Sequence, residues 1–279
     1  MHPPYTYVAV GERYKVLEKK VGDTPLQVLE ELRSNNEWLQ GISLTYAGRL
    51  DPMAEGKLLI LIGNECKKRE RYNGLDKEYE FEVLLGFSSD TGDVLGVAEA
   101  SGERYAEPSG KELEKVVRSF IGTHEINYPA FSSKTINGTP LFQHALQGTL
   151  PNDMPTTTIH IYRMEYLGAE IVETKELVGR VVNKINTLQA PADSGKIGAD
   201  FRKKEIIERW HSFKNVQNKE YTLLKFKAVV SSGTYIRVLA PLIAERLGVS
   251  GLAYSIHRTK IGRYQTLTGH FGFWRKTFT

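Results

Sequence analysis

Hydrophobic and polar residues alternate in several parts of the chain with the two-residue period of β-strands. The clearest case is residues 77–86, KEYEFEVLLG, in which Tyr79, Phe81, Val83 and Leu85 share one face. The apolar run at 57–62 predicts a buried strand. Further strands are expected at 14–18, 97–100, 156–172, 221–230 and 251–264.

Apolar residues with helical spacing recur between these strands. Leu26, Leu29 and Leu32 follow Thr24 and Pro25, which suit the N-cap and the first position of a helix. Asn137-Gly138, between two short apolar runs, predicts a tight hairpin. Further helices are expected at 110–120, 141–146 and 235–247.

Residues 173–218 differ from the rest of the chain. Their apolar residues are spread thinly, ADSGKIGAD is typical of a flexible loop, and FRKKEIIERWHSF predicts a short charged helix that carries Trp210. We interpret this segment as a peripheral insertion.

Composition limits the class of protein. The chain has 279 residues, of which 41% are hydrophobic and 25% charged, as is typical of folded globular proteins. A formal charge of +4 permits an anionic partner such as nucleic acid without requiring one. The single cysteine, Cys66, excludes an intramolecular disulfide and a Cys-based zinc site, and suits a reducing cytoplasm.

We expect no membrane span, because no stretch of about 18 uninterrupted apolar residues occurs. We also expect no signal peptide, because residues 1–15 contain no long apolar core behind a basic cluster. The histidines never recur at the spacing of a metal-binding pair, so no metal site is expected.

One loop carries an acidic residue that is a candidate for catalysis. In residues 46–63, YAGRLDPMAEGKLLILIG, Asp51 precedes a buried strand, with Arg49 two residues away and Gly48 and Gly56 on either side. An Asp-Pro step also commonly starts a turn, so this stretch alone leaves a structural and a catalytic role open.

Three other groups of charged residues invite a functional interpretation. Asp90 and Asp93 fall in a turn, where three-residue spacing favours self-capping over a metal or acid–base site. Arg237 lies near a helix N-terminus, where a cation opposes the helix dipole, so we expect it to meet a ligand or an aspartate. The basic run 67–71 is interpreted as a solvated helix face rather than an RNA-phosphate contact.

Six stretches in order resemble the TruB-type tRNA pseudouridine-55 synthases. Residues 46–58, YAGRLDPMAEGKL, are similar to the family's H-T-G-x-L-D-P-x-A-x-G-x-L. Residues 19–24 match K-P-x-G-x-T except that Lys20 replaces the proline. The other matches are K-x-Y with L-G-x-x-T-D-T-x-D-x-x-G at 77–79 and 85–96, the hairpin region at 128–148, G-T-Y-I-R at 233–237, and L-R-R-T-x-x-G at 256–262.

The resemblance implies an α+β fold, the pseudouridine synthase fold: a mixed, largely antiparallel sheet flanked by helices, with an RNA-binding cleft. It implies a catalytic domain at 1–264 that contains the insertion at 173–218. The remaining residues, 265–279, would form a short tail with no room for the C-terminal PUA domain typical of bacterial members.

The resemblance also implies residue roles. Asp51 would be the catalytic carboxylate, Tyr79 the aromatic that stacks on the target base, and Arg237 the partner that keeps Asp51 ionised. Ile256 would pack in the uridine pocket. Further substrate contacts are expected from Tyr46, Arg49, Asp90 and Tyr235.

The implied activity is isomerisation of a flipped-out T-loop uridine of tRNA to pseudouridine. No metal or organic cofactor would be needed. The T arm of tRNA would be the partner, and we expect a cytoplasmic monomer with no protein partner and no contact with a membrane.

Departures from the family pattern leave alternatives open. Tyr46 stands where the family has a histidine that enters the RNA loop, while Thr135 and Leu146 stand where it has basic residues, which weakens the expected phosphate contacts. A synthase acting on another RNA and a non-catalytic RNA-binding protein are therefore alternatives. A hydrolase using Asp51 with Asp90 or Asp93 is disfavoured, because nothing else assembles around those acids.

Overall fold

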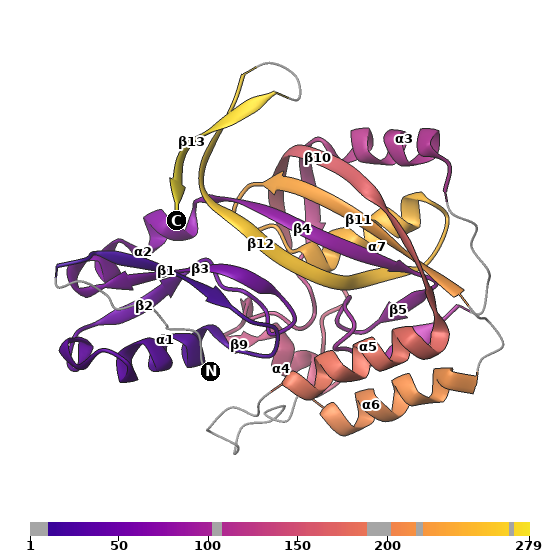
Figure 1. Ribbon diagram of the computed structural model, residues 1–279, viewed down its shortest axis with the longest axis horizontal. Helices are drawn as coiled ribbons and strands as arrows, with labels where there is room; N and C mark the ends of the chain where they lie inside the picture. The colour runs from indigo at the N-terminus through magenta and orange to yellow at the C-terminus, as the bar shows by residue number, and fades with distance from the viewer. Residues whose placement is uncertain (1–10, 102–107, 189–201, 216–219, 268–270) are drawn as a thin grey trace.

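The computed structural model describes residues 11–101, 108–188, 202–215, 220–267 and 271–279. Within these residues a nine-stranded sheet has the main order β1-β3-β12-β4-β11-β10-β7, with β2 beside β3 and β13 beside β12 (Figure 1). Every pairing in it is antiparallel except that of β12 with β3. Its strands are Tyr14–Lys19 (β1), Leu44–Ala47 (β2), Glu55–Ile62 (β3), Asp76–Leu85 (β4), Gly122–Asn127 (β7), Thr156–Glu173 (β10), Glu220–Val230 (β11), Gly251–Thr266 (β12) and Gly272–Phe278 (β13).

Helices flank this sheet, and two small hairpins complete the described secondary structure. The α-helices are Pro25–Ser34 (α1), Arg69–Asn73 (α2), Gly110–Phe120 (α3), Leu141–Leu146 (α4), Thr174–Thr187 (α5), Lys203–Ser212 (α6) and Ile236–Arg246 (α7). The 3₁₀ turns are Glu37–Leu39 (η1), Gly63–Lys68 (η2) and Phe213–Asn215 (η3). The small hairpins pair Phe87–Ser89 (β5) with Ala98–Ala100 (β6) and Thr135–Ile136 (β8) with Thr139–Pro140 (β9).

The N-terminal half of the sheet is covered on both faces, which explains why β3 is apolar along its length. Leu58 and Ile60 pack with α1, whereas Leu59 and Leu61 pack with Tyr72 of α2. The helix α1 begins with a capping box, in which Thr24 and Gln27 exchange side-chain and backbone hydrogen bonds.

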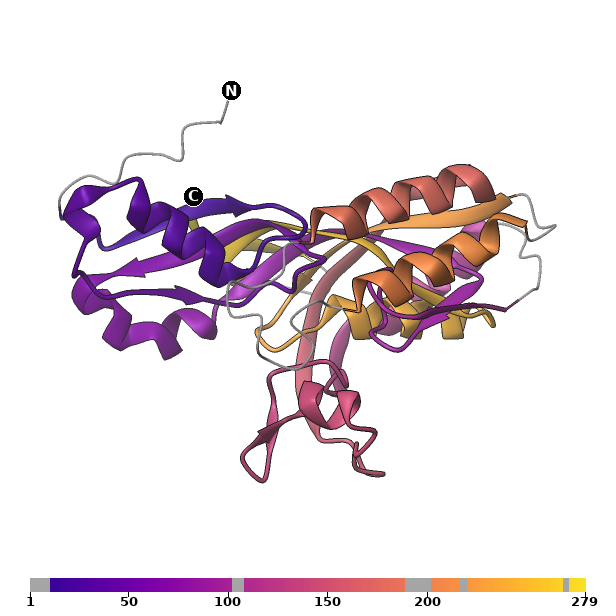
Figure 2. The same ribbon diagram turned by 90° about the horizontal axis from the view of Figure 1, so that it is seen from below.

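The larger core lies in the C-terminal half. The helix α7 packs against β12 and β4, while α3 and α5 pack against β10. In Figure 2, α5 and α7 lie on opposite sides of the sheet. None of the helices in the described part of the chain is long and apolar enough to span a membrane.

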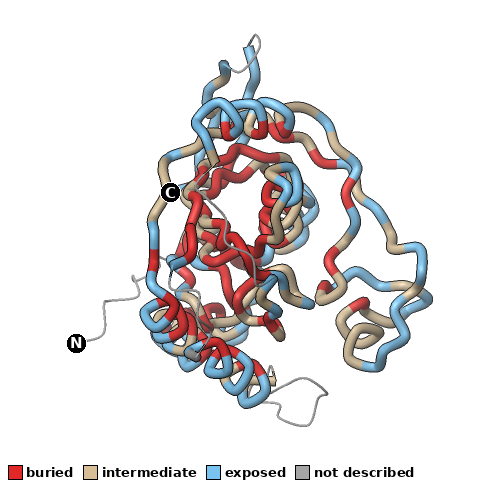
Figure 3. The backbone as a smooth tube through the Cα atoms, turned by 90° about the vertical axis from the view of Figure 1, so that its right-hand side faces the viewer, coloured by how far each residue is buried: buried red, intermediate tan, exposed pale blue. Residues whose placement is uncertain are grey.

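The segment between β7 and β10 projects away from the sheet, on the same side as α2 and α7 (Figure 2). It carries the β8–β9 hairpin and α4, and most of its residues are exposed or half-buried, in contrast to the buried strands (Figure 3). Asn137 and Gly138 both have positive φ, as a tight two-residue hairpin turn requires. The predicted hairpin and the short helix after it are therefore confirmed.

The predicted mixed, largely antiparallel sheet is also confirmed, but three of its strands were not predicted. These are β2, β7 and β13. The first has four residues, and the second, GTHEIN, has only Ile126 buried, so neither shows a clear two-residue pattern.

The interpretation of 173–218 as peripheral is wrong for its described residues. Val178 and Val181 of α5 and Trp210 of α6 are fully buried in the main core. The Trp210 ring contacts Phe87, and its indole nitrogen donates to the carbonyl of Val94 at 3.1 Å. Charged residues on the outer faces of both helices conceal this apolar content in the sequence.

The expected tail at 265–279 is likewise a structural part of the sheet in its described residues. The strand β12 continues to Thr266, and β13 pairs back along it. Phe278 is buried and packs edge-on against Tyr14 and Tyr72.

Replacing Trp210 tests whether α6 belongs to the core. We expect Trp210→Ala to lower the free energy of unfolding by about 3–5 kcal/mol, because it leaves a cavity beside Phe87. Urea unfolding measures this loss. The exposed neighbour provides the control, since His211→Ala should change stability by less than about 0.5 kcal/mol. Equal, small effects of both substitutions would show that α6 is peripheral after all.

Candidate active site

Asp51 lies in the loop that connects β2 to β3. The side chains of Leu50, Met53 and Ala54 are buried around it, whereas 29% of the Asp51 side chain is exposed. The amide of Ala54 donates to the carbonyl of Asp51 at 3.0 Å, which closes a tight turn over Pro52. The loop is thus anchored by apolar side chains on both sides of a carboxylate that reaches solvent.

Close contact with β12 fixes the end of this loop. Gly56 has φ +104°, and a Cβ placed there would lie 2.4 Å from the carbonyl oxygen of Arg258. Only glycine fits this approach, since every other residue adds a Cβ. The parallel pairing of β3 with β12 at Gly56 and Arg258 therefore sets the position of the Asp51 loop above the sheet.

Three buried cations hold the backbone around the loop. The Lys19 ammonium donates to the carbonyls of Ala54 at 2.6 Å and Lys20 at 2.8 Å. Arg258 Nε donates to the carbonyl of Lys57 at 2.7 Å, and the Lys77 ammonium donates to the carbonyl of Asn73 at 2.8 Å.

Their burial is close to complete, which is unusual for charged side chains. Burial lowers the pKa of Lys19 to about 8 and that of Lys77 to about 7. For Lys19 the negative charges of Asp23 and Asp51 oppose this effect. The cations therefore serve to fix backbone geometry near Asp51, at a cost in desolvation.

Arg237 binds Asp51 from the first turn of α7. Its Nε donates to Asp51 Oδ2 at 2.7 Å, while Nη1 donates to the carbonyl of Thr91 at 2.9 Å and Nη2 to that of Phe131 at 3.1 Å. Only 4% of its side chain is exposed. Burial lowers the pKa of the guanidinium, but the charges of Asp51 and Asp93 outweigh this and raise the pKa above its ordinary value. The predicted meeting of Arg237 with an aspartate is confirmed.

Asp93 is a second carboxylate at the same guanidinium, and the prediction of site residues missed it. Its Oδ2 lies 3.5 Å from Arg237 Nε, and its Oδ1 accepts from Thr91 and from the amide of Leu95. Burial raises the pKa of Asp93 to about 6, because it outweighs the opposing effect of Arg237. A Cβ at Gly92 would lie 2.4 Å from the Arg237 carbonyl, so this turn packs directly on α7.

Asp90 does not join this cluster. Its Oδ1 accepts from the amide of Val97 at 2.8 Å, and its Oδ2 pairs with Arg202 at 2.6 Å. Both carboxylates accept a hydrogen bond from an amide of their own turn, so the expected self-capping is confirmed. Of the two, Asp93 is the one that also lies against Arg237.

Tyr79 and Ile256 share one face of the sheet near the site. Ile256 pairs with Phe81 across β12 and β4, and Arg258 pairs with Tyr79, so the four side chains lie on one face. Tyr79 and Ile256 are both buried. They offer an apolar surface beside the Arg258 that holds the loop.

Tyr235 lies at the N-cap of α7, two residues before Arg237. Its ring meets that of Tyr128 edge-on at 5.9 Å. Burial raises the pKa of Tyr235, and the nearby negative charge of Asp51 adds to the rise. Tyr235 therefore stays protonated beside the carboxylate.

Two guanidinium groups lie close to the Tyr46 side chain. Arg49 Nη2 donates to the Tyr46 hydroxyl at 3.1 Å. The guanidinium carbons of Arg49 and Arg69 lie 6.0 and 5.5 Å from the centre of the Tyr46 ring. The basic run at 67–71 is exposed, which a solvated helix face requires, and the Arg69 guanidinium lies over this aromatic ring.

Three residues that the prediction of site residues missed fall within the family patterns of the sequence. Asp93 and Lys19 occupy matched positions of the family patterns, although nothing in the local sequence states that they are buried. Lys77 opens the K-x-Y strand in the same way. Their importance follows from tertiary packing under the Asp51 loop.

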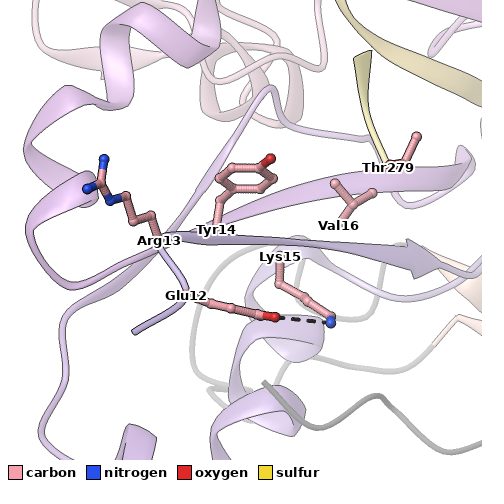
Figure 4. A pocket seen from close by; sticks show the side chains of 6 residues that line it. All are labelled: Glu12, Arg13, Tyr14, Lys15, Val16 and Thr279. Carbon is pink, nitrogen blue, oxygen red and sulfur yellow. Dashed lines mark ion pairs between the residues drawn. The ribbon is translucent and has the colours of Figure 1, made fainter. Parts of the chain in front are cut away.

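A separate hollow lies at the edge of the sheet (Figure 4). It is lined by Glu12, Arg13, Tyr14, Lys15, Val16 and Thr279. Glu12 and Lys15 form an ion pair across it at 3.8 Å. It contains none of the predicted site residues, so it is not the site around Asp51.

Comparison with known proteins agrees with these motifs. A family model described as "TruB family pseudouridylate synthase (N terminal domain)" matches residues 38–181. The tRNA pseudouridine synthase B of Geobacillus thermodenitrificans (strain NG80-2) is 28% identical over 222 residues, which are 79% of this chain and 58% of that protein. The protein of the same name from Lactococcus lactis subsp. lactis (strain IL1403) is 28% identical over 241 residues, which are 86% of this chain and 59% of that protein.

The fold has a counterpart among solved structures. A chain in the crystal structure of a Cbf5-Nop10-Gar1 complex matches 90% of this chain with a TM-score of 0.52 and 16% sequence identity, over 49% of its own length. This likeness concerns the fold alone.

Replacing Lys19 tests whether its ammonium group is buried with a lowered pKa. Because its folded pKa of about 8 lies below the value of 10.5 for an unperturbed lysine, its contribution to stability is present above pH 10.5 and is lost as the pH falls through 8. Between pH 8 and 10.5, the free energy of unfolding of the wild type should therefore rise relative to Lys19→Met by up to about 3 kcal/mol. Urea unfolding across this pH range measures the difference.

The exposed neighbour serves as the control for this series. Lys20→Met should show no comparable change between pH 8 and 10.5. A constant difference between the wild type and Lys19→Met would contradict a buried, perturbed ammonium under the loop.

Proposed function

The chain belongs to the TruB family of pseudouridylate synthases, and we propose that it isomerises a uridine of tRNA to pseudouridine with Asp51 as the catalytic carboxylate. One observation carries the proposal: a buried guanidinium, Arg237, holds a partly exposed carboxylate in a fixed position. Binding of RNA needs surface cations but no such pair. A carboxylate that is ionised and oriented before the substrate arrives is what chemistry at a sugar or a base requires.

The reaction rearranges the uridine without changing its composition. The N1–C1′ bond breaks, the uracil rotates, and a C5–C1′ bond forms, while C5 loses a proton and N1 gains one. Asp51 acts either as a nucleophile on the sugar or the base, or as a base at the ribose. In each case the guanidinium of Arg237 stabilises the negative charge of the carboxylate before and after the step.

The aromatic and apolar residues would receive the base. A uridine in an RNA loop has to leave its stack, at a cost of a few kcal/mol, before it reaches a protein side chain. Stacking on Tyr79 offsets part of that cost, and Ile256 on the same face of the sheet packs against the uracil. Arg49 and Tyr235 flank the carboxylate as further substrate contacts.

The polar turn around Asp90 would have an indirect role. Asp90 is engaged by the amide of Val97 and by Arg202, so it supports the turn that carries Asp93 to Arg237. We therefore assign Asp90 to positioning rather than to direct contact with the substrate.

We propose the T arm of tRNA as the substrate and a cytoplasmic monomer as the acting species. The family membership and the names of the relatives support tRNA. The match to this chain spans 58% of the Geobacillus thermodenitrificans protein and 59% of the Lactococcus lactis protein. A synthase that acts on another RNA is the second candidate, because Thr135 and Leu146 stand where the family has phosphate-binding cations.

Mapping of pseudouridine in an unmodified tRNA transcript tests the activity. We expect the wild-type protein to convert the T-loop uridine and Asp51→Asn to convert none, because the amide provides neither a nucleophile nor a base. The matched control is Glu114→Gln on α3, which removes one exposed negative charge and should retain full activity. Mapping at single-base resolution identifies the position.

Other outcomes distinguish the alternatives. Product at a different position, or only in another RNA, selects the second candidate. Tight binding of tRNA without product indicates a non-catalytic RNA-binding protein. A fully active Asp51→Asn protein contradicts the mechanism.

Arg69 provides a test of Tyr46, which we propose enters the RNA loop in place of the family's histidine. Arg69→Gln removes one guanidinium from the Tyr46 ring and should weaken tRNA binding by about three- to fivefold, as expected for one exposed cation–π contact. The single-turnover rate at saturating protein should not change, because the carboxylate is untouched.

The control is Arg71→Gln, which removes an exposed charge from the same helix. Its loss of affinity should be smaller than that of Arg69→Gln. Equal losses would show that Arg69 acts through its charge alone and does not support Tyr46.

A further inference from the structure

The β12–β13 hairpin projects beyond the body of the sheet (Figure 1). Its described residues expose large apolar side chains, with Phe271 76%, Leu267 65% and Phe273 46% exposed. Exposed apolar side chains gathered on a projecting element mark a contact surface for a partner. Neither the family motifs nor the site around Asp51 accounts for them.

The charge of the hairpin identifies the chemistry of that partner. No aspartate or glutamate follows Glu245 in the sequence. Arg263, Arg275 and Lys276 are exposed, and none of them forms an ion pair within the described residues. No acidic side chain of the described residues neutralises these cations, so the surface would attract an anionic partner.

The pairing of the strands places two of these cations against each other. Arg263 and Lys276 are direct partners across β12 and β13. Like charges at directly opposed positions of an antiparallel pair destabilise it. In the isolated protein the Lys276 ammonium lies 4.9 Å from the centre of the Phe278 ring, and no acidic side chain pairs with either cation in the described residues. An anionic partner that binds between the two cations removes their repulsion.

The charged face of the hairpin continues toward the proposed active site. Arg263 and Lys276 lie on the same face as Ile261 and Phe278, because one residue separates them along each strand. Phe278 packs against Tyr72 of α2 at 5.7 Å, so this face turns toward α2.

The same helix α2 carries Arg69, which lies over Tyr46. Both α2 and the projecting segment between β7 and β10 lie on one side of the sheet (Figure 2). The hairpin cations therefore extend a basic surface that begins beside the Asp51 loop.

We propose that this face of the β12–β13 hairpin binds the sugar-phosphate backbone of the substrate RNA outside the target loop. The proposal rests on the proposed function and extends it to a second contact. Arg263 and Lys276 bind phosphates, and the exposed Phe273, on the same face, stacks on an unpaired base or a ribose.

The distance along β12 between Arg258 and Arg263 supports an RNA contact at the hairpin that is separate from the one at Asp51. Arg263 lies five residues beyond Arg258, which corresponds to roughly 16 Å along β12. Arg258 lies under the Asp51 loop, so RNA whose target base reaches Asp51 has to extend away from it to meet the hairpin. RNA is favoured over a protein partner because Arg275 and Lys276 lie on an edge strand, where such cations discourage pairing with another strand.

Salt-dependent binding of an unmodified tRNA transcript tests the proposal. Every protein carries Asp51→Asn, so that no product forms during the titration. Adding Arg263→Gln and Lys276→Gln should weaken binding and reduce the slope of log K against log salt by about 1.4–1.8, as expected for two lost phosphate contacts. Adding Phe273→Ser should weaken binding by about fivefold or more and leave the slope unchanged.

A matched pair of substitutions controls for net charge. Lys111→Gln with Lys115→Gln removes two exposed cations from α3, away from the hairpin, and should leave the slope within about 0.3 of its starting value. The thermal midpoint of the Arg263→Gln, Lys276→Gln protein should change little, because relief of the repulsion between the opposed charges offsets the loss of the exposed Lys276–Phe278 contact. A structural role of the two cations would instead lower it.

Three results would overturn the proposal. These are an unchanged slope in the hairpin variant, an equal fall in the α3 control, and a dimer that Phe273→Ser dissociates while RNA binding stays intact. None of them depends on catalysis, so pseudouridine mapping with the wild-type protein reports separately on the proposed function.

Discussion

The ion pair between Arg237 and Asp51 is the interaction on which the rest of the site depends. A buried guanidinium has to find acceptors for its N–H groups, since unpaired buried charge costs several kcal/mol. Arg237 finds them on three segments: the Asp51 loop, Thr91 in the turn after β5, and Phe131 at the base of the projecting segment. One side chain on α7 therefore fixes three segments that are distant in sequence around a single carboxylate.

The backbone near Asp51 is constrained in a second way, by cations that bind carbonyl groups. Lys19, Lys77 and Arg258 are almost fully buried, and each donates to backbone oxygens on or beside the Asp51 loop. Burying three cations is expensive, and apolar side chains would be expected to stabilise the fold at least as well. Their value lies in geometry, because a charge-assisted hydrogen bond sets the direction of each carbonyl and so the direction in which Asp51 leaves the loop.

Much of the fold and the central pair of the site follow from local patterns in the sequence. The two-residue alternation around Tyr79 predicts β4, and the position of Arg237 against the helix dipole predicts its contact with an acid. The residues that were missed depend on tertiary contacts. Asp90 and Asp93 occupy the same turn, and only the docking of Gly92 on α7 decides that Asp93 faces Arg237. The predicted roles of Tyr79, Ile256 and Tyr46 toward RNA stay predictions.

The two wrong interpretations have different causes. In α5, Leu177, Val181 and Ile185 recur with helical spacing, but charged neighbours lower the average hydrophobicity of the segment. Periodicity is the better guide to burial in such a helix than mean composition. In β13, three consecutive polar residues precede Phe278 and the pairing with β12 is irregular, so no two-residue alternation marks the strand in the sequence. The N-terminal and C-terminal halves of the sheet also meet through β12, which no local pattern could show.

The coupling between Asp51 and Arg237 is the most direct measure of whether this pair organises the site. A double-mutant cycle on the free energy of unfolding, with Asp51→Asn, Arg237→Gln and the double variant, isolates that coupling from the separate losses of each side chain. The structure predicts a coupling of at least about 1 kcal/mol, because each group is the main charged partner of the other. Losses that add to within about 0.3 kcal/mol would show that the two side chains act independently, and would contradict the central place given to the pair.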